Sequence, residues 1–385
     1  VTSGTALALK GRTLLLYASP LFNRQNDVER WKKAYNEITT DLPRINACGY
    51  GLVNESNVGT NASGWASVFS MVDGNTEAVF VTLYNNKATG GVPDFSKNNS
   101  WEHGIRPSNT MGGGGKTPSS MMVDMFPMAD GKRPSTCDTY TTLDQSSIAY
   151  DKNVPFANRD PRMAMTVLYP GMDWVNYKGE ETIINTLDKE VNGKTNPDHP
   201  GTANNSSKTG LTWAKYLAPM SQYGDVWSSN AQTIIFRYAE VLLTYVEAEN
   251  ELNGPSAEIY DMLDQIRTRV GMPKVDQSKY GTKETLRELI RRERSIELAG
   301  EGLRRADILR WKDASGKMVA ETVLNAPLES FTGTINYDEK DPYKRAVISG
   351  VELVENRSFA PHNRYLPIKQ DALDKNKQLK QNDGY

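Results

Sequence analysis

The chain has 385 residues and a formal net charge of −2, with charged side chains at 24% of its positions. This length can bury a large core and form one large domain or two. Because positive and negative charges are mixed, neither a basic surface for nucleic acid nor a polybasic membrane patch is expected. No apolar run approaches the roughly 18 residues of a membrane-spanning helix. The 18 tyrosines and 7 tryptophans, among many Asn, Gly, Ser and Thr residues, suit a neutral polar ligand such as a sugar, and equally an ordinary secreted surface.

Residues 1–80 are predicted to form a helical scaffold. Ala6–Tyr17 is apolar on more than half of its circumference, and Asp27–Thr40 follows as a second helix. A shorter helix is expected over Trp65–Met71, after which Ala78–Leu83 changes to a β-rich run. This part of the chain therefore predicts helices that lead into a strand.

Residues 81–233 read as a loop-rich, partly β excursion. From Tyr84 to about Asn230 the sequence is dense in Gly, Pro, Asn and Ser and has no sustained helical period. So long an irregular stretch is uncommon unless it is functional or disordered, and its aromatic content argues against disorder. The run Gly112–Thr117 resembles a phosphate-binding loop, but Thr110 stands where that motif needs glycine, so an ordinary flexible loop is expected.

Residues 234–311 predict a helical hairpin followed by a charged helix. Gly254-Pro255 ends the first helix, and Gly271-Met272-Pro273 ends the second, which gives a pair about as long as one tetratricopeptide-like repeat. The two apolar stripes are Ile235, Ala239, Leu242 and Val246 on the first helix and Tyr260, Leu263, Ile266 and Val270 on the second.

The third helix, which opens after the N-cap residue Thr282, carries two carboxylates on its apolar side. Counting about 100° per residue places Glu293 and Glu297 in the middle of the face formed by leucines and isoleucines. Buried charges persist only when they are paired, so a structural ion-pair network is favoured over catalysis. The candidate partners are Arg267, Arg269, Arg292, Arg294, Arg304, Arg305 and Arg310.

Residues 312–385 are predicted to be an irregular C-terminal wrap over the helices, with Tyr365–Ile368 as an extended anchor. The fold class expected for the whole chain is mainly α, as a single domain over residues 1–385. A tetratricopeptide-like helical-repeat scaffold would carry the loop-rich excursion.

Several motifs along the chain occur together in the order typical of one family. They are Ala6–Phe22, Met122–Gly131, Asn158–Arg162, Tyr169–Gly171, Arg237–Glu240, Ile266–Pro273, Glu293–Leu298, Glu301-Gly302, Arg310-Trp311 and Gln381–Tyr385. The chain thereby resembles the SusD/RagB family of surface glycan-binding lipoproteins. It departs from the family pattern at Gly300 and Ala306, where bulky or aromatic residues are common, and at Lys369 and Asp383, where proline is common. These departures affect only local packing.

The resemblance implies a protein of the outer membrane, exposed at the cell surface and anchored through an N-terminal lipid. It implies capture of an oligosaccharide or polysaccharide without catalysis, and delivery to a SusC-like TonB-dependent transporter. Some relatives bind peptides or other nutrients, so a non-sugar ligand is an alternative. Family members begin with a lipoprotein signal and a first set of helices, and an N-terminal portion of that kind is expected to be missing from this chain.

A sugar site needs aromatic faces for stacking and planar polar groups for hydroxyls, presented by loops on a rigid scaffold. The segment after the β-rich run has this composition, and loops of this region contribute to the glycan platform in SusD-like proteins. The candidate ligand-binding residues are Trp101, Tyr84, Asn86 and Arg106, with Trp65 and Trp174 as weaker candidates. The alternative for Trp101 is that it anchors its own loop. Trp31 and Trp311, on or near helices, are expected in the core.

No catalytic residue and no cofactor are predicted. His103, His199 and His362 are far apart in the sequence and form no metal motif, while structural calcium held by Asp and Asn stays open. Cys48 and Cys137 form no metal spacing, and a disulfide between them stays open. A pure protein-interaction scaffold would explain the helices but not the aromatic loops. A glycoside hydrolase would need an exposed carboxylate pair across a cleft, which the sequence does not identify.

Overall fold

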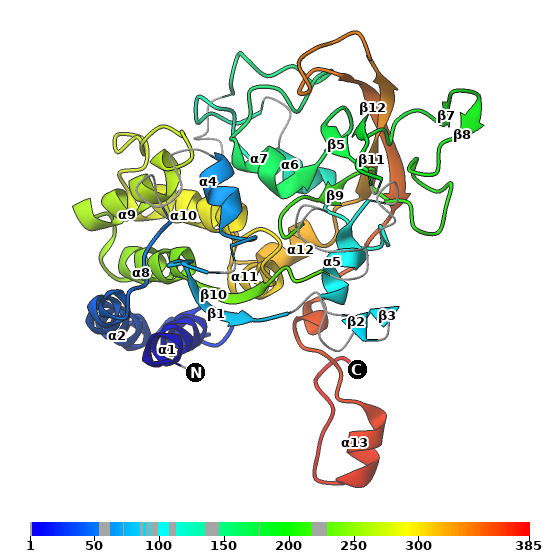
Figure 1. Ribbon diagram of the computed structural model, residues 1–385. Helices are drawn as coiled ribbons and strands as arrows, with labels where there is room; N and C mark the ends of the chain where they lie inside the picture. Colours follow the sequence, from blue (N-terminus) through cyan, green and yellow to red (C-terminus); the bar gives the residue numbers. More distant parts are fainter. Residues whose placement is uncertain are drawn as a thin grey trace.

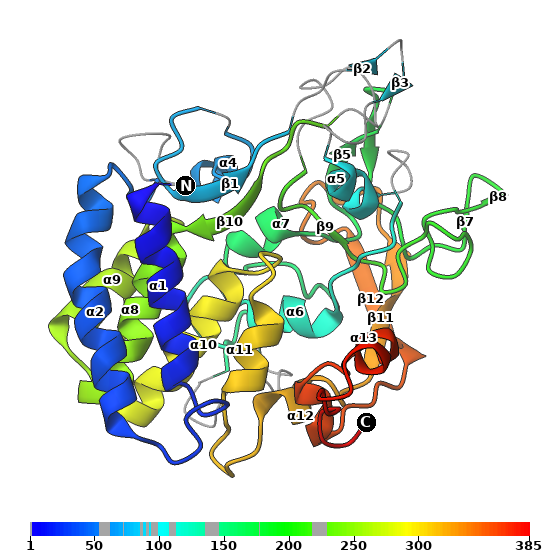
Figure 2. The same ribbon diagram turned by 90° about the horizontal axis from the view of Figure 1, so that it is seen from below.

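A computed structural model of the protein describes residues 2–53, 62–71, 73–84, 88–89, 92–93, 99–107, 113–134, 146–176, 178–217 and 229–385. Figures 1 and 2 show helices layered on one side and short strands and loops on the other. The main helices are α1 (Ser3–Ala18), α2 (Val28–Ala47), α8 (Tyr238–Asn253), α9 (Ala257–Thr268), α10 (Lys283–Glu297) and α11 (Arg304–Arg310). Helix α8 lies at the centre of the layer and contacts α1, α2, α9 and α10.

Local sequence signals place the starts of these helices. Side chains of Thr2, Asp27, Ser256 and Thr282 accept hydrogen bonds from backbone N–H groups in the first turns of α1, α2, α9 and α10. Gly254 ends α8 with a φ of 82°, a left-handed conformation that favours glycine. The predicted αα-hairpin and charged helix are therefore confirmed, while the assignment to a tetratricopeptide-like repeat stays a prediction.

Several helix boundaries differ from the sequence prediction. Helix α2 continues past Thr40 to Ala47 with Pro43 inside it, because Leu42 and Ile45 are buried in the main core and their packing offsets the proline. Helix α4 (Ala62–Ser67) also begins earlier than the predicted short helix. Apolar packing between helices, which sequence periodicity does not measure, decides such boundaries.

A two-stranded ribbon joins distant parts of the chain. Strand β1 (Ala78–Thr82) pairs antiparallel with β10 (Thr233–Arg237), and Phe80 lies opposite Phe236. The β-rich prediction is confirmed, but Ile235 belongs to this ribbon and not to the apolar stripe of α8, and it is 37% exposed. Helix α8 therefore starts at Tyr238, directly after the strand.

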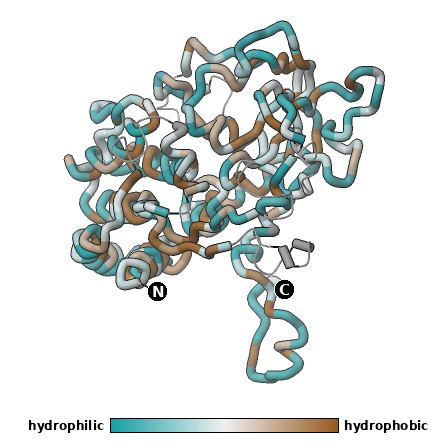
Figure 3. The backbone as a smooth tube through the Cα atoms, viewed as in Figure 1, coloured by the Kyte–Doolittle hydropathy of each residue, from teal (hydrophilic) through white to brown (hydrophobic). Residues whose placement is uncertain are grey.

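The excursion is built from short elements around a second core. Its helices are α5 (Ser100–Ile105), α6 (Ser120–Met125) and α7 (Arg162–Thr166). Its strand pairs are β2 (Ala88–Thr89) with β3 (Val92–Pro93), β4 (Val167–Leu168) with β9 (Thr212–Trp213), β5 (Asp173–Val175) with β6 (Glu181–Ile183), and β7 (Glu190–Val191) with β8 (Lys194–Thr195). The second core joins Phe126, Phe156 and Val167 of this region to residues of the C-terminal segment. In Figure 3, apolar stretches gather in the layered helices, and the outer loops are mostly hydrophilic.

The C-terminal segment is not irregular throughout, which corrects the prediction for residues 312–385. After α12 (Val319–Val323), strands β11 (Leu328–Ile335) and β12 (Ala346–Glu355) form an antiparallel hairpin. Burial of Ile335, Ala346 and Ile348 in the second core explains the hairpin, because the partner surface comes from distant sequence.

The last elements are the 3₁₀ helix η3 (Pro361–Arg364) and α13 (Gln370–Lys375), which lies on an arm that projects from the body (Figure 1). Tyr365–Ile368, predicted as an extended anchor, is non-helical, but Leu366 within it is 72% exposed, so this segment does not anchor the chain in a core. There Ile368 exchanges two backbone hydrogen bonds with the Gln381 side chain, and these tie the arm to the chain end.

Candidate functional site

Helix α5 presents Trp101 at the surface, where its side chain is 42% exposed. The helix is fixed at its start by Asn99, whose side-chain oxygen accepts from the backbone N–H of Trp101 at 3.1 Å and of Glu102 at 3.2 Å. Asn99 is itself buried and donates to the Ala231 carbonyl oxygen at 2.7 Å. The exposed indole is thus held by a short helix tied to the strand region before β10.

One face of the Trp101 ring carries a positive charge. The ammonium of Lys116 lies 3.6 Å from the ring centroid, which is a cation–π contact. Both side chains are exposed, so the contact is worth about 0.5–1 kcal/mol. A ligand that stacks on the exposed indole can therefore displace this weakly held lysine.

Glycines bring the Lys116 loop close to α5. The N–H of Gly113 donates to the His103 carbonyl oxygen at 3.0 Å, and a Cβ on Gly113 would lie 3.3 Å from the Cα of Gly104. Gly114 has a φ of 52°, and a Cβ there would lie 1.9 Å from the carbonyl oxygen of Asn205. The described part of the glycine run is therefore packed where side chains do not fit, and this holds Lys116 beside the tryptophan.

The structure gives the other predicted ligand residues different places. Arg106 is 1% exposed, and its guanidinium pairs with the buried carboxylate of Glu102 one turn earlier. A side chain so deeply buried does not reach a surface ligand, so we assign Arg106 to holding α5 in place. Tyr84 is half-buried just beyond β1, and Asn86 lies outside the described residues. As ligand contacts, Tyr84 and Asn86 stay predictions.

The remaining tryptophans divide clearly by burial. Trp65 is 2% exposed and belongs to the core, which excludes a surface role in this structure. Trp174 is half-buried on β5. Trp31 and Trp311 are buried, which confirms their prediction as core residues. Of the tryptophans that the structure describes, Trp101 alone is exposed.

The two carboxylates predicted to face the interior are buried in an ion-pair network. Glu297 is fully buried and accepts from Arg162 at 2.8 Å, Arg237 at 2.7 Å and Arg269 at 2.6 Å. Glu293 accepts from Arg162 at 2.6 Å and Arg267 at 3.0 Å. This confirms a structural role for the pair.

This set, which we call the Glu297 network, also contains residues from distant segments. Its members are Glu77, Asp160, Arg162, Lys215, Arg237, Arg267, Arg269, Glu293, Glu297 and Glu301. Arg162, from the Asn158–Arg162 motif, ties the excursion to the scaffold through Glu293 and Glu297. Sequence reasoning missed Glu77, Lys215 and Arg237, whose only signal is a charge within or beside an apolar run.

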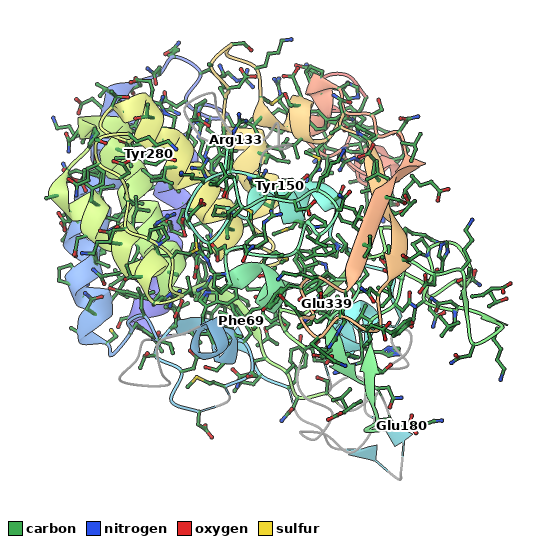
Figure 4. The ribbon with its side chains drawn as sticks, turned by 90° about the horizontal axis from the view of Figure 1, so that it is seen from above. Phe69, Arg133, Tyr150, Glu180, Tyr280 and Glu339 are labelled. Atoms are coloured by element: carbon green, nitrogen blue, oxygen red, sulfur yellow. The ribbon has the colours of Figure 1, made fainter. Side chains whose placement is uncertain are left out.

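Electrostatics fix the protonation of this network. Burial alone would raise the pKa of Glu297, but three arginines hold that pKa well below its usual range. Burial lowers the pKa of Lys215 to about 8, against the opposing effect of Glu301. The Lys215 ammonium also lies 4.4 Å from the centroid of Phe69, which Figure 4 labels. A buried carboxylate whose pKa is lowered has no proton to donate at neutral pH, so Glu293 and Glu297 do not form a general acid–base pair.

A second buried network supports α11. Glu247 on α8 accepts from Arg310 at 2.7 Å and from the indole N–H of Trp311 at 2.8 Å. Asp307 accepts from Arg294 at 2.8 Å and Arg310 at 2.9 Å. Burial would raise the pKa of Glu247, but Arg310 lowers it to about 2. These contacts hold helices together and leave no open site.

Other chemistry is limited in the part of the chain that the structure describes. There, no three His, Cys, Asp or Glu side chains gather in a way that could hold a metal ion. Within the same residues, no helix has the length and apolar character needed to cross a membrane. Cys48 is exposed and free, and Cys137 lies outside the described residues.

Comparisons with known proteins place the chain among SusD proteins. A model of the SusD family matches residues 76–385. Two proteins of Formosa agariphila are similar over shorter stretches. SusD-like protein P25 is 42% identical over 79 residues, which cover 20% of this chain and 15% of that protein. SusD-like protein P2 is 32% identical over 140 residues, which cover 35% of this chain and 26% of that protein.

The fold of the whole chain is similar to that of solved structures. A SusD-like protein of Bacteroides fragilis is 25% identical with a TM-score of 0.72, and the match covers 100% of this chain and 65% of that one. A SusD-like carbohydrate-binding protein of the same species is 26% identical with a TM-score of 0.68, covering 98% and 64%. The chain thus spans slightly less than two thirds of these two structures and a smaller share of the curated relatives. Because the family model covers most of the chain, the protein belongs to the SusD family.

Proposed function

We propose that this protein is a non-catalytic glycan receptor that binds an oligosaccharide or polysaccharide on the surface formed by α5 and the Lys116 loop. The observation that carries the proposal is Trp101, an exposed indole on a fixed support. An aromatic face stacks on the apolar C–H surface of a sugar ring. The carbohydrate-binding relative from Bacteroides fragilis supports the choice of ligand.

We also propose the location and the partner that are expected of this family. The receptor would be a surface-exposed outer-membrane lipoprotein, and it would deliver its ligand to a SusC-like TonB-dependent transporter. The absence of catalysis is supported by the Glu297 network, where the conspicuous carboxylate pair is buried and held ionised by arginines.

Calorimetric titration against a panel of soluble polysaccharides tests this function. Trp101→Ala should weaken binding about tenfold or more, because loss of one stacking aromatic costs on the order of 1–2 kcal/mol. Tyr17→Ala is the matched control, because Tyr17 is 46% exposed, carries a cation–π contact from Arg30 at 4.2 Å, and belongs to α1 and not to α5 or the Lys116 loop. That variant should bind like the unmodified chain.

The same samples separate the alternatives. Binding without release of reducing sugar supports a receptor, whereas sugar release would replace it with a hydrolase. If no polysaccharide binds but peptides do, the ligand class is wrong and the receptor handles another nutrient. Equal binding by the Trp101→Ala and Tyr17→Ala variants would remove Trp101 from the site.

A further inference from the structure

A groove of about 470 Å³ lies between the β11–β12 hairpin and residues 187–200. Figures 1 and 2 both show the part of the excursion that carries β7 and β8 beside this hairpin. The volume lies within the range of about 300–1,000 Å³ that is usual for small-molecule sites. None of its lining residues belongs to α5 or to the Lys116 loop, so it is separate from the Trp101 surface.

Hydroxyl groups form one wall of the groove. Ser330, Thr332 and Thr334 line it from alternate positions of β11, and alternate residues of a strand share one face. Ile335 of the same strand is buried in the second core, and Phe331, which also lines the groove, packs against that core. The hydroxyl wall is therefore held in place by the packing of its strand against the second core.

Ser330 contributes a hydroxyl to this wall. Its side chain is 4% exposed and lines the groove, and its hydroxyl is not left both buried and unpaired. A hydroxyl both donates and accepts hydrogen bonds, so Ser330 can bond to a ligand hydroxyl in the groove.

The other wall is held by two buried asparagines. Asn185 accepts from the backbone N–H groups of Leu187 at 3.2 Å and Asp188 at 3.1 Å. Asn196 donates to the carbonyl oxygens of Asn185 at 2.9 Å and Asp188 at 2.8 Å. These hydrogen bonds hold the loop that faces the hairpin in one conformation. A ligand can therefore bind between the two walls with little conformational change of the protein.

The charges around the groove select against anions. The carboxylates of Asp188, Glu190 and Glu352 line it together with the ammonium of Lys189. The surplus of negative charge repels polyanions, whereas carboxylates accept hydrogen bonds from neutral hydroxyls. Hydroxyls, carboxylates and one ammonium together suit a polyhydroxyl compound without negative charge.

We infer that this groove is a second saccharide-binding site, which takes a short uncharged saccharide and discriminates against sulfated or uronic ones. The choice of a saccharide rests on the proposed function. The groove, its hydroxyl wall and its charge do not depend on Trp101.

Hydrogen–deuterium exchange of the whole chain, measured with a panel of uncharged oligosaccharides of glucose, galactose, mannose and xylose, tests both sites separately. A saccharide in the groove should protect residues 187–200 and 328–335, whereas the Trp101 surface would be protected at 99–107 and 113–117. Protection at the groove alone supports this inference and removes the Trp101 proposal. Protection at α5 alone supports the Trp101 proposal and overturns the inference of a groove site. Protection at neither place overturns both proposals.

Ser349→Arg should then raise about tenfold the saccharide concentration that gives half-maximal protection of the groove, because the larger side chain enters the groove from β12. Ser315→Arg is the matched control, an exposed serine in a turn outside the groove, and it should change nothing. Unchanged groove protection in Ser349→Arg would overturn the inference.

The charge selection has its own test. Sulfated versions of the oligosaccharide that protects the groove should bind about tenfold more weakly or worse. In the double variant Glu190→Gln with Glu352→Gln, the affinities for the uncharged and the sulfated oligosaccharide should become more similar. Equal affinity already in the unmodified chain would contradict the assignment of these carboxylates.

Discussion

Two tryptophan–lysine pairs in this protein lead to opposite roles. Trp65 is 2% exposed, donates its indole N–H to Glu297 at 2.9 Å, and has Lys215 at 4.8 Å from its ring. Trp101 is 42% exposed, and Lys116 lies at 3.6 Å from its ring. In the first pair every polar group has a fixed protein partner, which makes it structural. In the second pair the indole is partly exposed, which makes it suited to a ligand.

The largest expected effect is in the buried region. Glu297→Ala leaves Arg162, Arg237 and Arg269 without a shared carboxylate, and breaking a buried ion pair costs about 3–5 kcal/mol. Urea denaturation should show this loss in the free energy of unfolding. Glu288→Ala, on the same helix with its side chain 41% exposed, should lose less than about 1 kcal/mol. Similar losses in both variants would contradict the distinction between buried and exposed charges.

Acid should unfold the buried region before it changes the exposed one. The folded-state pKa of Glu247 is about 2, against 4.5 without the fold, so its ionised form is favoured in the folded state. That stabilisation, about 3 kcal/mol, is complete above pH 4.5 and is lost as the pH falls toward 2. Denaturation midpoints measured between pH 7 and pH 2 should fall, and Glu247→Gln should flatten the dependence. An unchanged slope in Glu247→Gln would show that other carboxylates carry it.

A smaller loss of stability is expected from changing Gly114, whose close packing holds the Lys116 loop beside Trp101. Gly114→Ala places a methyl group against the Asn205 carbonyl oxygen at a positive φ, which costs on the order of 1–3 kcal/mol locally. Exchange protection should fall in residues 113–117 and glycan affinity should fall with it. Gly316→Ala, at a similarly positive φ with open space around it, controls for backbone strain alone. If the two variants behave alike, the close approach to Asn205 does not position the loop.

The smallest effect on stability is expected at the platform itself. Lys116→Ala removes an exposed cation–π contact worth about 0.5–1 kcal/mol and leaves the second indole face open. Thermal denaturation should therefore change little, while the intrinsic fluorescence of Trp101 should respond. If Lys116→Ala lowers the stability as much as Glu297→Ala does, the exposed tryptophan–lysine pair is also structural, and the distinction between the two pairs is wrong.

Much of the buried region could be predicted because its signals are local. Glu293 and Glu297 share a helix face with leucines, and Arg267 and Arg269 stand close by in sequence. The same reasoning did not find Glu77 or Arg237, because their contacts bridge long sequence separations. It also assigned Ile235 to a helix, since the competing pairing of β10 with β1 depends on a distant strand.

The sequence by itself determined the starts of α2 and α10, most of the apolar faces and the family, because caps, periodicity and motifs depend on neighbouring residues. Only the tertiary structure decided which tryptophan is exposed, that Arg106 is buried, and that residues 328–355 form a hairpin. Solvent exposure and strand pairing depend on which distant segments pack together, and that information is not contained in the local order of residues.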